Sequence, residues 1–282
     1  MVKITPSNLS LNPILIPAII RMMRNKIKIV FLDFDGTLFS HSSASIPASA
    51  LKALRTLREN GIEVFLCTGR AYAEFADFDL SAIALSGRIL SNGQMIFDDK
   101  DRLIFHKPIQ GLLKEKIIAL FEETAFPMYM VTADDIYLNA ISPLVKEVQD
   151  SVTSSMPRIK KYEGEEIYMA SAFFDKEEDI EKVFALKDLA EITWWHDGAV
   201  DIVPKGISKV QGIDEVLRYC GFTTEEALSI GDGYNDIEML KHCAFSIAMG
   251  NACLEAKEAA SYITEDIDQD GLYNGLKHYD LL

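Results

Sequence analysis

The chain has few basic residues for its size. Its 282 residues include 28 Lys and Arg against 43 Asp and Glu, which gives a formal net charge of −15 at pH 7. A nucleic-acid partner needs a basic surface that releases counterions from the phosphate backbone, and no basic cluster stands out here. The composition therefore argues against nucleic acid. An anionic small molecule fits only if a cation meets its charge.

Cysteine is also scarce, and no pair is arranged as C-x-x-C. The four cysteines are Cys67, Cys220, Cys243 and Cys253. Disulfide frameworks are typical of small secreted chains, and zinc sites need ligand pairs at a characteristic spacing. We therefore expect reduced thiols, a cytoplasmic location and no zinc.

No apolar run is long enough to cross a bilayer, because a spanning helix needs about 20 consecutive apolar residues. The apolar run in residues 1–25 is interrupted by Pro13 and Pro17, and no small-residue cleavage site follows it. We expect residues 1–25 to be a surface extension, or to precede a true start at Met22 or Met23. No membrane partner is expected.

What the chain does have is an alternation of apolar and amphipathic segments from Lys26 onward. The run "IKIVFL" (27–32) is typical of a parallel strand that is covered on both faces. A helix is predicted over 45–61, a second strand over 62–67, a short helix over 71–80, and a third strand over 82–86. Residues 92–106 read as a hairpin whose turn is Asp-Asp-Lys-Asp.

The pattern changes between residues 107 and 196, where helix-like segments interleave with short apolar strands. Strand–helix alternation returns after residue 196. The fold class that we predict is α/β, with a Rossmann-like parallel sheet in a core domain of residues 26–106 and 197–282. An α+β domain of residues 107–196 would be inserted into it.

Three polar clusters each follow an apolar strand of the predicted core. The clusters are Asp33 and Asp35, then Thr68-Gly69-Arg70, then Gly231-Asp232-Gly233 with Asn235 and Asp236. The carboxyl ends of parallel strands lie along one edge of a sheet, so these segments would converge there. Carboxylates that meet in this way repel one another unless a cation holds them, and Mg²⁺ is the natural candidate.

The residues in these clusters match a known family. "DFDGT", "TGR", the lysine of "GISK" and "GDGYND" resemble, in order and spacing, the four motifs of the haloacid dehalogenase-like (HAD) phosphohydrolases. The insert after the second motif is similar to the cap domain of the Cof-type, type IIB group, and the segments "AMGNACLEAKEAASYIT" and "QDGLYNGL" fit it as well. The resemblance extends over nearly everything from Lys26 onward.

The resemblance implies a role for each catalytic residue. Asp33 would be the nucleophile that forms an aspartyl-phosphate, and Asp35 would protonate the leaving alcohol and then activate water. Lys209 would supply positive charge for the transition state, and Thr68 would bind phosphoryl oxygens. "PKGISKV" also offers Lys205, and Val210 stands where the family often has glycine, so Lys205 remains the alternative.

Contacts to substrate and metal follow from the same resemblance. The predicted phosphate-binding residues are Phe34 and Gly69 through their backbone amides, with Thr68, Lys209 and Asn235. The predicted Mg²⁺ ligands are Asp33, the carbonyl of Asp35, and Asp232, with Asp236 supporting them. Outside these motifs, His41 is close enough in sequence to contact the entrance, and Trp194 and Trp195 are interpreted as packing residues, with substrate stacking as the alternative. Tyr234, inside "GDGYND", is interpreted as filling space at the loop.

The predicted function is a Mg²⁺-dependent phosphatase acting on a small phosphorylated metabolite, by resemblance a sugar phosphate or a nucleotide-like phosphate. The inserted domain would form a lid that excludes water and contacts the leaving group. The alternatives are a phosphomutase, which returns the phosphoryl group to a sugar, and a binding protein without turnover. Phosphate release without isomer formation would distinguish hydrolysis from both.

Overall fold

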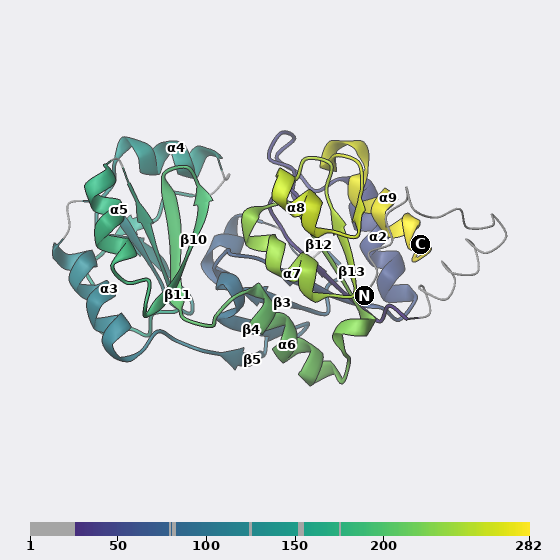
Figure 1. Ribbon diagram of the computed structural model, residues 1–282, viewed down its shortest axis with the longest axis horizontal. Helices are drawn as coiled ribbons and strands as arrows, with labels where there is room; N and C mark the ends of the chain where they lie inside the picture. Colours follow the sequence, from purple (N-terminus) through teal and green to yellow (C-terminus); the bar gives the residue numbers. More distant parts are fainter. Residues whose placement is uncertain (1–25, 79, 81–82, 124–125, 152–154, 175) are drawn as a thin grey trace.

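The computed structural model describes residues 26–282 apart from 79, 81–82, 124–125, 152–154 and 175. The predicted extension of residues 1–25 lies outside the described part. Two β-sheets with their own helices lie side by side along the long axis of the molecule (Figure 1). We call the eight-stranded sheet the core sheet and the six-stranded sheet the cap sheet.

The core sheet has the strand order β14-β13-β12-β1-β2-β3-β4-β5. Its first six strands are parallel, and β4 and β5 are added as antiparallel strands at one edge. The strands are β1 (Ile29–Leu32), β2 (Glu63–Cys67), β3 (Gly87–Leu90), β4 (Met95–Asp98), β5 (Leu103–His106), β12 (Ala227–Gly231), β13 (Phe245–Ala248) and β14 (Tyr262–Ile263). This arrangement confirms the predicted α/β class.

Strand β1 is buried on both faces, as its apolar run predicts. Val30 and Leu32 pack in one core cluster, with helices α2 (Ala48–Glu59), α8 (Leu254–Ala259) and α9 (Gly271–His278). Ile29 and Phe31 pack in another, with α6 (Lys209–Cys220) and α7 (Ile237–His242). Alternate side chains of one strand therefore fix helices on both sides of the sheet.

Two predicted elements near β3 need correction. The third strand is not at 82–86: the described residues 83–86 form no strand, and β3 is Gly87–Leu90. Ile83 and Leu85 contribute to the core cluster instead of pairing. Only glycine fits at position 87, because a Cβ there would lie 2.4 Å from the carbonyl oxygen of Phe97 on the paired strand. The helix predicted over 71–80 is a short 3-10 helix, Tyr72–Asp77, whereas the β4–β5 hairpin is confirmed.

The cap sheet has the order β10-β11-β9-β6-β7-β8 and is antiparallel except for the pair β7–β8. Its strands are β6 (Met128–Val131), β7 (Ile136–Leu138), β8 (Arg158–Ile159), β9 (Met169–Phe173), β10 (Ala190–His196) and β11 (Ala199–Pro204). Helices α3 (Gly111–Glu123) and α5 (Glu177–Phe184) cover one face, and α4 (Pro143–Ser151) packs on the other. The rest of that second face borders the cavity described below.

Strand pairing suggests a different end for the inserted domain than the predicted boundary at His196; the division into domains remains a prediction. The predicted boundary after His196 falls within the β10–β11 hairpin, and β11 pairs with β9 and β10. We therefore propose that the inserted domain continues to Pro204. Among the described residues, no helix combines the length and apolar character needed to cross a membrane.

Candidate active site

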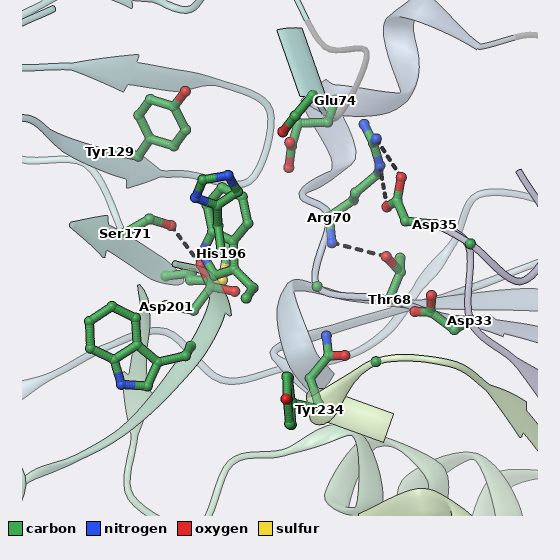
Figure 2. Close-up of a pocket in the computed structure, with 18 of the residues that line it drawn as sticks. Asp33, Asp35, Thr68, Arg70, Glu74, Tyr129, Ser171, His196, Asp201 and Tyr234 are labelled. Carbon is green, nitrogen blue, oxygen red and sulfur yellow. Dashed lines mark hydrogen bonds and ion pairs between the residues drawn. The ribbon is translucent and has the colours of Figure 1, made fainter. Parts of the chain in front are cut away.

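The three predicted polar clusters meet at the carboxyl edge of the core sheet. Asp33 follows β1, Thr68 follows β2 and Asp232 follows β12, and these strands are adjacent. All three residues line a cavity of about 380 Å³ that is closed on its other side by residues of the cap sheet (Figure 2). Parallel-strand topology therefore places these distant segments together, as the sequence predicts.

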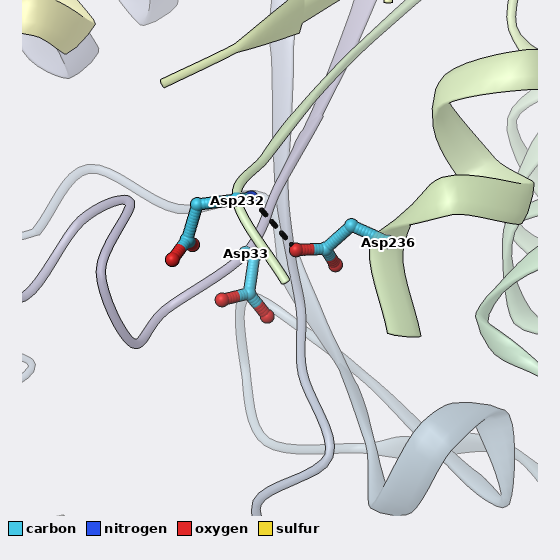
Figure 3. Close-up of side chains that lie close together, drawn as sticks. All are labelled: Asp33, Asp232 and Asp236. Atoms are coloured by element: carbon cyan, nitrogen blue, oxygen red, sulfur yellow. Dashed lines mark hydrogen bonds between the residues drawn. The ribbon is translucent and has the colours of Figure 1, made fainter. Parts of the chain in front are cut away.

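Asp33, Asp232 and Asp236 form an acidic cluster (Figure 3). One carboxylate oxygen from each lies within 4.8 Å of the others. Burial and the charge of Asp236 raise the pKa of Asp33 well above its usual range, and the same two causes raise the pKa of Asp232 to about 7. A divalent cation between Asp33 and Asp232 would offset this repulsion, so the donor set fits Mg²⁺.

Lys209 is the buried cation of the site. It is the first residue of α6, and its Nζ donates to Asp33 Oδ1 and to Asp236 Oδ1, both at 2.6 Å. Lys205, the alternative in the sequence, is exposed and donates to the Lys187 carbonyl oxygen. The structure therefore brings Lys209 to Asp33 and leaves Lys205 outside the site.

Asp236 holds the other members of the cluster in place. Its Oδ1 accepts from Lys209, and its Oδ2 accepts from the backbone N–H groups of Asp232 and Gly233, both at 2.9 Å. Because both oxygens are engaged, Asp236 supports the loop, as the sequence interpretation has it, more than it offers a ligand. Thr37 donates to Asp232 Oδ1 at 2.7 Å and so orients that carboxylate.

The Asp35 carboxylate is held by Arg70 and His41. Arg70 donates to it through Nε and Nη2, both at 2.7 Å, and His41 Nε2 lies 2.8 Å from Oδ1. Burial alone would raise the pKa of Asp35, but hydrogen bonds from His41 and Arg70 bring it below its usual value. A metal-binding role for Asp35 therefore depends on its carbonyl group, as predicted, and not on its side chain.

The other predicted contacts are distributed around the cavity. Thr68, Gly69 and Asn235 line it, and Thr68 Oγ1 accepts the Arg70 N–H at 3.1 Å. The Phe34 side chain does not line the cavity and is fully buried against Phe39 at a ring distance of 5.4 Å. The role predicted for Phe34 belongs to its backbone, which adjoins Asp33.

The cap sheet contributes the opposite wall of the cavity. Tyr129, Ser171 and Asp201 reach it from β6, β9 and β11. Trp194 and Trp195, interpreted from the sequence as packing residues, do pack, with ring distances of 5.9 Å to Phe184 and 6.0 Å to Phe173. Both also line the cavity, as does the exposed Tyr234.

Comparisons with known proteins agree with this geometry. The profile of the haloacid dehalogenase-like hydrolases matches residues 30–276. The chain belongs to this family. It is 30% identical over 258 residues to YkrA of Bacillus subtilis (strain 168), provisionally named a phosphatase, covering 90% of this chain and 98% of that protein. Membership of the family is consistent with a phosphoric monoester hydrolase.

Two solved structures extend the likeness to the whole described fold. One is the HAD subclass IIB sugar phosphatase BT4131, with 32% identity, a TM-score of 0.81, and coverage of 90% of this chain and all of that one. The other is the HAD phosphatase BT1666 from Bacteroides thetaiotaomicron, with 30% identity, a TM-score of 0.81, and coverage of 91% and 96%. The predicted HAD family and type IIB affinity are thereby confirmed.

In this HAD hydrolase, Arg70 is the residue that sequence reasoning missed. It belongs to the quoted "TGR", but only Thr68 and Gly69 were given roles. Its guanidinium is buried over the rings of Phe34 and Phe78, at 5.4 and 4.9 Å, and forms the bidentate pair with Asp35. An arginine directly after a phosphate-binding turn, in an acidic chain, was the available signal.

Proposed function

We propose that this HAD hydrolase is a Mg²⁺-dependent phosphatase that hydrolyses a small phosphorylated metabolite through an aspartyl-phosphate on Asp33. The observation that carries this proposal is the placement of Asp33 at the cavity wall, 2.6 Å from Lys209 and beside Asp232. A carboxylate in contact with a buried cation suits attack on a phosphoryl group. The phosphatases among the relatives support the same reaction class.

In the first step, an Asp33 oxygen would attack phosphorus while the bond from phosphorus to the leaving oxygen breaks. Lys209 would hold the orientation of Asp33 and offset negative charge in the transition state. Asp33 and Asp232 would hold Mg²⁺, which supplies positive charge to the phosphoryl oxygens. Thr68 and the Gly69 amide would bind those oxygens from the β2 side.

Asp35 would act as the general acid in the first step and as the general base in the second. The leaving oxygen needs a proton from Asp35 in the first step, and water must give a proton to Asp35 as it attacks phosphorus and breaks the bond to Asp33. The contacts with Arg70 and His41 favour the carboxylate form of Asp35, which is the form required for the second step. Protonation for the first step would accompany loosening of these contacts.

The cavity supports a small substrate. About 380 Å³ matches a metabolite-sized ligand, and both sheets contribute to the lining. A sugar phosphate or a nucleotide-like phosphate therefore remains our proposed substrate class, with the cap sheet contacting the leaving group.

Asp33→Asn tests the proposal. We expect phosphate release from p-nitrophenyl phosphate with Mg²⁺ to fall by about 10⁴-fold or more, because a nucleophile has been removed, while the circular dichroism spectrum is retained. Asp188→Asn, an exposed cap residue, is the matched control and should keep full activity. Substantial turnover by Asp33→Asn would contradict the covalent mechanism, and isomer formation from a hexose phosphate would indicate a mutase.

A further inference from the structure

Two acidic side chains in the cavity have no part in the proposed phosphoryl transfer. Glu74 lies in the 3-10 helix Tyr72–Asp77, four residues after Arg70, and Asp201 lies in β11 of the cap sheet. Figure 2 shows Asp201 on the cap side and Glu74 at the upper wall, between Tyr129 and Arg70. The cavity therefore has acidic groups beyond the phosphoryl site.

Asp201 and Glu74 both accept hydrogen bonds from uncharged donors. Asp201 is 8% exposed and accepts hydrogen bonds from Ser171 Oγ at 2.7 Å and Asn92 Nδ2 at 2.9 Å. Glu74 accepts the Ala71 N–H at 2.7 Å. Burial raises the pKa of Glu74 above its usual value and outweighs the charge of the Arg70 guanidinium, which lowers that pKa. Because burial raises the pKa of Asp201 to about 7, this side chain is mostly ionised only above that pH.

The basic groups that line the cavity are engaged elsewhere. Arg70 and His41 both contact Asp35. His196 Nδ1 accepts the Gly198 N–H at 3.2 Å. A second anionic group on a substrate would therefore face two buried acidic side chains, while the Arg70 guanidinium is already paired with Asp35, which is unfavourable.

Aromatic side chains form part of the remaining wall. Tyr129, Trp194 and Trp195 line the cavity. The Tyr129 hydroxyl is buried and has no hydrogen-bond partner among the described residues, and a buried polar atom of this kind points to a ligand. Carboxylates next to aromatic side chains form an environment that attracts ammonium groups.

We propose that Glu74 and Asp201 select a phosphate monoester whose leaving group carries a protonated amino group, a selection that rests on the phosphatase function proposed above. The ammonium would donate to the two carboxylates and to the Tyr129 hydroxyl while the phosphoryl group lies at Asp33. A neutral hydroxyl at the same place can donate only one hydrogen bond and brings no charge. A carboxylate there would be repelled.

Three hexose derivatives test this selection. Glucosamine 6-phosphate, glucose 6-phosphate and 6-phosphogluconate carry an amino group, only hydroxyl groups, and a carboxylate, respectively. We expect kcat/KM for the amine to exceed that for the neutral ester by about tenfold or more, the size of one hydrogen bond between charged groups, and the carboxylate to be the poorest substrate. Equal values, a preference for the neutral ester, or no turnover of the amine would overturn the inference.

Variants locate the selection in these two residues. Glu74→Gln and Asp201→Asn each keep a hydrogen-bond acceptor and remove the charge, so each should lower the amine-to-neutral ratio of kcat/KM by about tenfold. General structural damage would lower both rates and leave the ratio unchanged. Glu177→Gln and Asp188→Asn, exposed cap residues, are matched controls that should keep the wild-type ratio. An unchanged ratio in both pocket variants would overturn the inference.

The proposed phosphatase function and the proposed amine preference can be contradicted by different results. Absence of p-nitrophenyl phosphate hydrolysis by the wild-type protein with Mg²⁺ would contradict the proposed function. Hydrolysis of that ester without an amine preference would contradict only the inference about Glu74 and Asp201.

Discussion

At the scale of single residues, the buried charges of the site form two separate groups. Lys209 bridges Asp33 and Asp236, and Arg70 pairs with Asp35. Asp33, the proposed nucleophile, and Asp35, the proposed acid–base residue, are close in sequence but are oriented by cations from different segments. Each can therefore be perturbed without direct loss of the other's partner.

Arg70→Lys tests whether the bidentate pair positions Asp35. Lysine keeps the charge but cannot form two parallel hydrogen bonds, so Asp35 would lose its fixed orientation. We expect kcat to fall by about tenfold or more, which corresponds to one charged hydrogen bond, with little change in KM. Steady-state kinetics on p-nitrophenyl phosphate would measure this.

Arg88→Lys provides the matched control. Arg88 also stacks near aromatic rings, those of Tyr72 and Phe97, and pairs with Asp101, but it does not line the cavity. Its replacement should leave kcat unchanged. Equal kinetics for wild type and both variants would rule out a positioning role for Arg70.

Asp201 should make stability depend on pH. Burial is the main cause that raises its pKa from 3.8 to about 7, so between these values the folded protein holds the proton more tightly than the unfolded chain. The free energy of unfolding therefore falls as pH rises from about 4 to about 7. The contribution is up to about 4 kcal/mol, at ~1.4 kcal/mol per pKa unit.

Asp201→Asn removes this contribution. The free energy of unfolding of the variant minus that of wild type should be more positive at pH 8 than at pH 5. Urea denaturation in the presence of EDTA, at both pH values, would measure the difference. Parallel pH profiles for the two proteins would show that Asp201 titrates normally in the folded state.

At the scale of elements, the turn Ser91–Gly93 supports the start of α6. Gly93 has φ +102°, and a Cβ there would lie 2.4 Å from the Ser208 carbonyl oxygen, next to Lys209. The close approach of two backbones at this point therefore fixes the helix that begins with Lys209.

Gly93→Ala should consequently reduce both stability and activity. Backbone strain and overpacking together would cost about 2–4 kcal/mol, and kcat should fall because Ser208 and Lys209 must shift. Gly61→Ala is the control, since Gly61 has φ +75° and a Cβ added there would meet no atom within 4 Å; it should lose only about 1 kcal/mol and keep full kcat. Urea denaturation and kinetics would separate the two outcomes.

The elements differ in how far the sequence predicts them. β1 was predictable because all four of its residues are apolar and the motif follows at once. The strand expected at 82–86 was wrong because the apolar residues there pack into the core, while the strand itself is "GRIL". Tyr129, Ser171 and Asp201 could not be predicted to share a wall, since antiparallel pairing of β6, β9 and β11 brings them together from segments far apart.

At the scale of the whole molecule, residues that follow β3 of the core sheet hydrogen-bond directly to residues of the inserted segment, and both parts line the cavity. Asn92 donates to Asp201 at 2.9 Å, and Gln94 donates to the Tyr168 carbonyl oxygen. Substrate bound at Asp33 would therefore contact both sheets. The acidic cluster is equally non-local, because Asp33 and Asp232 meet only in the folded chain.

Mg²⁺ should therefore stabilise the folded protein as well as activate it. The ion would bind the folded state and not the dispersed aspartates of the unfolded chain, which adds about 2.7 kcal/mol when its concentration is 100 times Kd. We expect the Tm in EDTA to rise by a few degrees when Mg²⁺ is added in excess, and phosphatase activity to be lost in EDTA and restored by Mg²⁺. Asp232→Asn should abolish the Tm increase, whereas Asp188→Asn should keep it. A Tm that does not respond to Mg²⁺, together with turnover that persists in chelator, would show that the acidic cluster is held together by Lys209 alone.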